Sequence, residues 1–243
     1  MRRSTALVRP AAYPATRPGG RRIARVVVGA ALVVSLAGCG SGGSAAPHAD
    51  PAPSTAPLMP AAARFAGSAE RPAPEATVRP APGSWAGTGL PAGSTVVLVT
   101  RGDDTATATL AAAVRQHAAA HDADLTVLRA RDDDEVERRV DEAVAASADL
   151  VVGAGDGVVD VFSLVTAQYL ETPFLVVGAQ LPEPTHNVTA VVWPGAEFRG
   201  TGLGNEAADQ AAVTTERARD AVDAGVASVR HGLTGIVIEL PAR

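Results

Sequence analysis

The sequence contains no lysine, a single cysteine and few aromatic residues, and each shortage excludes a class of protein. All 21 of its basic residues are arginine, so a Schiff-base lysine and a phosphate-loop lysine are both excluded. Cys39 is the only cysteine, which excludes an internal disulfide and a cysteine-based metal cluster. Aromatic residues make up 3% of the chain, so platforms for stacking nucleic-acid bases are scarce.

The charge distribution also argues against a nucleic-acid partner. Seven arginines and no acidic residue precede Cys39. A chain beginning at Cys39 therefore carries 21 − 7 = 14 basic against 26 acidic residues, a formal charge of −12. Such a chain would be repelled by a phosphate backbone.

The first 38 residues have the features of a secretion signal. Residues 1–25 are basic, and residues 26–38 form an apolar run that is too short to span a bilayer comfortably. The run ends in Leu-Ala-Gly-Cys, which resembles the lipobox of bacterial lipoproteins. This resemblance implies cleavage before Cys39, lipidation of Cys39 and anchoring to the extracytoplasmic face of the cell membrane. The alternative is an ordinary signal peptide with an incidental cysteine, and the twin arginines leave the export route, Sec or Tat, open.

Residues 39–93 are predicted to be a disordered tether. The segment is rich in Ala, Pro, Gly and Ser and shows no apolar periodicity, so it lacks the apolar surface to offset its ordering entropy. Trp85 is its one conspicuous apolar residue, and either docks on the domain or lies exposed.

From residue 94 onward, strand and helix patterns alternate, which predicts one α/β domain over residues 94–243. Short apolar, β-branched runs separated by helical patterns are typical of a doubly wound, mostly parallel sheet with right-handed crossovers. We expect a flavodoxin-like strand order, 2-1-3-4-5. The five predicted strands are Thr95–Thr100, Leu125–Arg129, Asp149–Gly153, Pro173–Gly178 and Val188–Trp193.

Two segments outside these strands carry further predictions. Asp132 to Glu135 open a helix, where acids favour the positive helix end, and this role explains the run better than metal binding. In the tail, residues 205–230 predict a long helical stretch broken near residues 213–215. Residues 232–240 predict a strand that adds to the sheet or covers an edge.

Candidate ligand-binding residues follow the strands, because ligands of such sheets bind where the parallel strands end. Carboxylates after the first and third strands could hold Mg²⁺ or Ca²⁺, but helix caps and a solvated rim explain them better. A phosphoacceptor domain is excluded by the missing lysine. The candidates are Asp103, Asp104, Thr105, Asp156, Gln180 and Trp193.

His117 and His121 have the i, i+4 spacing of a zinc-binding pair on a helix. No third ligand is evident at a supporting spacing, and His117 borders the apolar stripe of its helix. The sequence therefore favours a half-buried helix histidine over a metal ligand.

With the strands placed, residues 96–204 resemble the first lobe of the basic membrane protein family of substrate-binding lipoproteins. The resemblance rests on VVLVTRGDD, ADLVVGAGDG, PFLVVGA and NVTAVVWPGAEFRGTGLG, and DAVDAGVASVRHGLTGIVIEL resembles the end of the family's chain. It implies one lobe of a type 1 periplasmic-binding-protein fold that lacks most of the second lobe. It also implies solute binding, mainly of nucleosides, for an ABC importer.

Departures from the family pattern weaken the nucleoside expectation. Gly155, Asp156 and Gly157 replace a stacking aromatic residue, and Thr105 to Thr107 replace a Ser-Phe-Asn segment. Asp103 and Asp104 match the family's acidic pair.

The sequence thus predicts a lipid-anchored, non-catalytic binding protein without a cofactor. One possibility is a solute receptor that works with an ABC permease, or a degenerate relative of such a receptor. The alternative is a non-transport or sensor-associated lipoprotein whose open strand-end face binds a partner protein, a membrane-associated sensor or a second copy.

Overall fold

The computed structural model describes residues 56–196 and 209–242, which form an α/β structure around one parallel sheet. All of the described residues belong to one compact unit. Cys39 and residues 197–204 of the glycine-rich stretch lie outside the described residues. No helix in the described ranges is both long enough and apolar enough to cross a bilayer.

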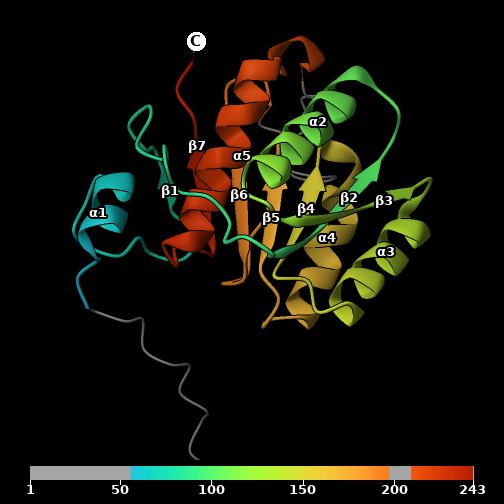
Figure 1. Cartoon of the computed structure of the whole chain (residues 1–243), viewed down its shortest axis with the longest axis horizontal. Helices are drawn as coiled ribbons and strands as arrows, with labels where there is room; N and C mark the ends of the chain where they lie inside the picture. The colour runs from blue at the N-terminus through green and yellow to red at the C-terminus, as the bar shows by residue number, and fades with distance from the viewer. Residues whose placement is uncertain (1–55, 197–208, 243) are drawn as a thin grey trace, which may run out of the picture. The chain divides into compact units, whose positions relative to one another are not determined.

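The sheet has seven strands in the order β1-β7-β6-β5-β4-β2-β3, and every neighbouring pair is parallel. The predicted order 2-1-3-4-5 is confirmed by β3-β2-β4-β5-β6, and the tail strand β7 extends the sheet beside β6. Figure 1 shows these strands side by side between helices. The strands are β1 (Thr77–Val78), β2 (Thr95–Arg101), β3 (Asp124–Ala130), β4 (Leu150–Ala154), β5 (Phe174–Val177), β6 (Val188–Val192) and β7 (Ile236–Glu239).

Two helical layers bury the two faces of the sheet. Alternate residues of β2 point to opposite faces, and both sets are buried, as expected for a parallel strand with helices on each side. One face packs against α2 (Thr105–Ala120) and α5 (Thr215–Arg230). The other packs against α3 (Asp133–Ala145) and α4 (Val159–Val165).

Local sequence signals account for the helix starts. Asp104 caps α2, Asp132 caps α3 and Thr214 caps α5, each accepting a hydrogen bond from the backbone N–H three residues on. The predicted break near residues 213–215 is confirmed, because the 3₁₀ turn Gln210–Ala212 ends just before α5. The acids of residues 132–135 cap and begin α3 as predicted.

The predicted disorder of residues 39–93 is wrong for residues 56–93. This segment forms the helix α1 (Pro60–Ala66), and β1 pairs with β7 at an edge of the sheet. Phe65 is fully buried and Trp85 is 7% exposed, so Trp85 docks on the domain. A few buried side chains, among them Phe65 and Trp85, hold the segment against a surface formed by the rest of the chain. Such scattered contacts leave no regular apolar pattern in the sequence.

Candidate binding face at the carboxyl edge of the sheet

Three neighbouring strands are each followed by a glycine with a positive φ angle. Gly102 follows β2, Gly155 follows β4 and Gly178 follows β5, with φ angles of 96°, 82° and 85°. Glycine adopts these positive angles at little cost. The backbone therefore turns sharply after each of these strands at the carboxyl edge of the sheet. We call residues 101–105, 154–158 and 178–180, which form these turns, the strand-end ledge.

The ledge brings together the predicted residues of neighbouring strands, because β4 lies between β2 and β5. Asp103, Thr105 and Asp156 are exposed, and Gln180 is half-buried. These four side chains are open to solvent in the region that the sequence indicated.

Asp104 already has a role within α2. Its Oδ1 accepts a hydrogen bond from the Thr107 backbone N–H at 2.8 Å, and its Oδ2 accepts one from the Thr107 hydroxyl at 2.6 Å. Burial by itself would raise the pKa of Asp104, but these hydrogen bonds lower it below its ordinary value of 3.8. Both oxygens of Asp104 thus stabilise the start of α2 within the ledge.

Trp193 lies in the core rather than on the ledge. Its side chain is 1% exposed, and its indole N–H donates to the Ala212 carbonyl at 3.1 Å. Such an indole presents no face on which a ligand at the ledge could stack. The sequence correctly placed Trp193 at the end of a strand. Its burial depends on other parts of the chain that cover this strand end, including Ala212.

Two ledge loops are in direct contact through Arg101 and Gly157. The Arg101 guanidinium donates to the Gly157 carbonyl at 3.3 Å and to Asp133 Oδ1 at 2.5 Å. A Cβ atom at Gly157 would lie 2.8 Å from the Arg101 carbonyl oxygen. Sequence analysis did not predict this contact, because it joins segments that are far apart in the chain.

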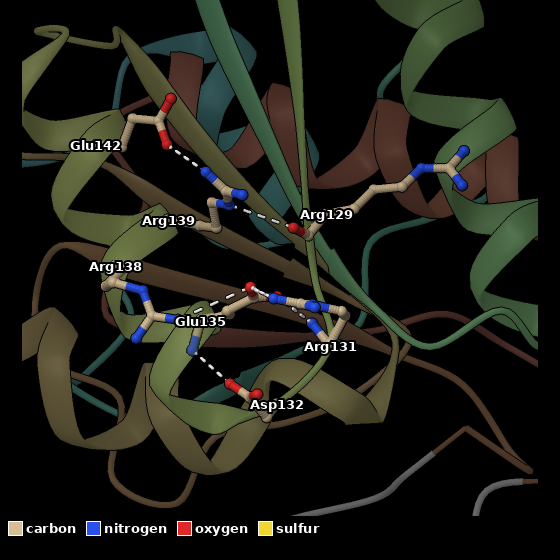
Figure 2. A network of polar contacts seen from close by, with 7 residues as sticks. All are labelled: Arg129, Arg131, Asp132, Glu135, Arg138, Arg139 and Glu142. Carbon is tan, nitrogen blue, oxygen red and sulfur yellow. Dashed lines mark hydrogen bonds and ion pairs between the residues drawn. The ribbon is translucent and has the colours of Figure 1, made fainter. Parts of the chain in front are cut away.

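A network of arginines and acids lies beside the ledge, at the carboxyl end of β3 and the start of α3 (Figure 2). Glu135 accepts hydrogen bonds from the backbone and guanidinium of Arg131, and Arg138 lies 3.8 Å away. The Arg131 side chain is the main reason that the pKa of Glu135 falls to about 2. Arg139 bridges to Glu142 and donates to the Arg129 carbonyl. The contact between Arg139 and the Arg129 carbonyl links α3 to β3, whereas Arg138 and the Arg139–Glu142 pair act within α3.

Three cavities lie elsewhere on the described residues. One of about 480 Å³ lies at the amino ends of β2, β4 and β5, and one of about 250 Å³ lies beside the start of β7. A third, of about 140 Å³, lies between α2 and α5. No ledge residue lines any of these three, and Asp103, Thr105 and Asp156 are exposed. In the described ranges, no three His, Cys, Asp or Glu side chains form a set of metal ligands.

Comparisons with solved structures find distant similarity to ABC transporter solute-binding proteins. A solute-binding protein from Aeropyrum pernix K1 is 18% identical over 42% of this chain and 29% of its own, with a TM-score of 0.38. A periplasmic ribose ABC transporter protein from Conexibacter woesei is 16% identical over 65% of this chain and 57% of its own, with a TM-score of 0.32. A putative lipoprotein fragment from Peptoclostridium difficile 630 is 12% identical over 58% of this chain and 99% of its own, with a TM-score of 0.42.

The chain therefore spans less than a third of the Aeropyrum protein and little more than half of the Conexibacter protein. No protein-family model matches the chain, and no curated protein matches it. The fold class, an α/β fold with an all-parallel sheet between helices, follows from the sheet order itself.

Proposed function

We propose that this chain is an extracytoplasmic, lipid-anchored binding protein whose ledge takes a small polar solute. It acts as the solute-binding component of an ABC importer or is a degenerate relative of one. The observation that supports this proposal is the ledge itself, where three adjacent strands end in glycine turns next to Asp103, Asp156 and Gln180. The anchor is Cys39, through its resemblance to a lipobox.

The chemistry of the ledge favours a ligand rich in hydroxyl groups. The carboxylates of Asp103 and Asp156 accept hydrogen bonds, and the Gln180 amide both donates and accepts. Sugars and the ribose of a nucleoside present hydroxyl groups that suit such partners. Binding, rather than catalysis, is the role that these side chains support.

A second candidate function follows from the openness of the ledge. Ligand sites usually bury most of a small molecule in a cleft of roughly 300–1,000 Å³, whereas the cavities described above lie away from the ledge. An open face suits a partner protein, or a second copy of this chain that supplies the missing wall.

Thermal unfolding in the presence of candidate ligands tests the first function. A ligand that binds only the folded state raises the free energy of unfolding with the logarithm of its concentration over Kd. We expect residues 39–243 to be stabilised by a member of a panel of nucleosides, sugars, amino acids and divalent cations. Asp103→Ala and Asp156→Ala should remove the shift.

Asp124→Ala is the matched control, because Asp124 is an exposed aspartate that begins β3 at the opposite, amino edge of the sheet. A shift that survives both ledge aspartate substitutions would contradict the ledge as the solute site. No shift across the panel, with a concentration-dependent dimer in sedimentation that Asp103→Arg disrupts, would favour the second function.

A further inference from the structure

The groove between α2 and α5 contains a buried histidine that is paired with a carboxylate on one side only. His117 of α2 is 5% exposed, and its Nδ1 lies 2.6 Å from Oδ1 of Asp223 on α5. An ionised carboxylate only accepts, so Nδ1–H donates to Asp223. In the neutral ring this leaves a lone pair on Nε2.

No hydrogen-bond partner satisfies the Nε2 atom of His117, although this atom is buried. A buried polar atom without a partner costs free energy and calls for a physical explanation, such as a missing water or ion. A bound cation with its waters would satisfy the free lone pair.

A second imidazole lies beside the first. His121 is one helical turn further along α2, half-buried, with its ring centroid 4.5 Å from that of His117. Two imidazoles that bind one ion at about 2.0–2.1 Å need centroids roughly 4.5–5.5 Å apart. Gly89 lies directly against the His121 ring, because a Cβ atom at Gly89 would be 2.1 Å from Cε1. The backbone there restricts how the His121 ring can turn.

A cavity of about 140 Å³ adjoins both rings, and Gln116, Arg219 and Asp223 line it as well. One water needs only about 10–15 Å³ of such volume, so the cavity has room for the waters of an ion held between the two rings. Arg219 is exposed and is the one positively charged side chain in this lining. Its charge opposes a cation, though only weakly at a solvent-exposed position.

We propose that His117 and His121 bind a divalent transition-metal ion, with waters completing its coordination. Imidazole ligands suit Zn²⁺, Cu²⁺ and Ni²⁺. Asp223 is a positioning residue, because a carboxylate behind a metal-bound histidine fixes its tautomer and raises its basicity. The site has two protein ligands and lies apart from the ledge, so it does not depend on solute binding.

Titration with Zn²⁺ tests the site on residues 39–243 carrying Cys39→Ser, so that no thiol competes for the metal. We expect saturable binding of one ion by calorimetry. His121→Gln should abolish it, and His121 is the informative ligand because it is only half-buried. Asp223→Asn should weaken binding roughly 10- to 100-fold. Arg219→Gln should strengthen it about two- to fivefold by removing a nearby like charge.

His186→Gln is the matched control, since His186 lines a different cavity, and it should leave the affinity unchanged. Electron paramagnetic resonance of bound Cu²⁺ gives a second readout, with coupling to two imidazole nitrogens that falls to one in His121→Gln. Absence of saturable binding, or equal affinity in His121→Gln, would overturn the proposal whether or not the ledge binds a solute.

Discussion

The ledge and the α2–α5 groove differ in how their side chains are held. At the ledge, Asp103 and Asp156 are exposed and project from turns after neighbouring strands. In the groove, the His117 side chain is 4% exposed and bonded to a carboxylate that is 106 residues away in the chain. Asp103 and Asp156 can therefore be substituted at little cost to stability, whereas the groove is part of the packing between two helices.

The largest expected effect on stability concerns Trp193, whose side chain is buried in the core beneath the ledge. Trp193→Ala should lower the free energy of unfolding by about 3–5 kcal/mol, because it removes a fully buried aromatic side chain and leaves a cavity. Urea denaturation measures the change. A decrease in the free energy of unfolding below about 1 kcal/mol would contradict the burial of Trp193 in the core.

Asp223→Ala should have the next largest effect. It leaves the buried His117 ring without its hydrogen-bond partner, which should cost about 1–3 kcal/mol. Asp103→Ala, the matched exposed aspartate at the ledge, should change stability by no more than about 0.5 kcal/mol. If Asp223→Ala and Asp103→Ala lowered the free energy of unfolding equally in denaturant, the proposed difference between the groove and the ledge would be wrong.

The smallest of the three destabilising effects concerns Asp104, a ledge residue whose side chain caps α2. Asp104→Ala should cost about 1 kcal/mol through loss of the α2 cap, and Asp104→Ser should retain most of it. Because folding lowers the pKa of Asp104 from 3.8, the ionised form is favoured in the native state. The contribution should be complete well above pH 4 and decline as the pH falls below the unfolded value.

Denaturation curves of the wild type and Asp104→Ala between pH 2.5 and 7 follow that decline. A stability difference that stays constant over this range would show that the Asp104 charge does not contribute to the cap.

Much of the fold could be predicted because its signals are local. The apolar runs of β2, β4, β5 and β6 and the caps at Asp104 and Asp132 are readable from neighbouring residues. The docking of residues 56–93 could not be predicted, since Phe65 and Trp85 are buried against helices and strands from elsewhere in the chain.

The candidate sites divide in the same way. Asp103, Asp156 and Gln180 could be placed at strand ends from sequence, because parallel strands bring their carboxyl ends to one edge. Asp223 could not be assigned to His117, and Arg101 could not be assigned to Gly157. Each of these contacts joins residues that are distant in the sequence. The first forms because α2 and α5 cover the same face of the sheet, and the second forms because two loops meet at its carboxyl edge.

The sequence by itself determined the order of strands and helices, the helix caps, the polar residues at the carboxyl edge and the lipobox-like segment around Cys39. These depend on periodicity and on contacts within a few residues. Only the tertiary structure decided that Trp193 is buried, that residues 56–93 join the fold and that His117 meets Asp223. The physical reason is that burial and long-range pairing depend on how whole layers pack, which no local pattern specifies.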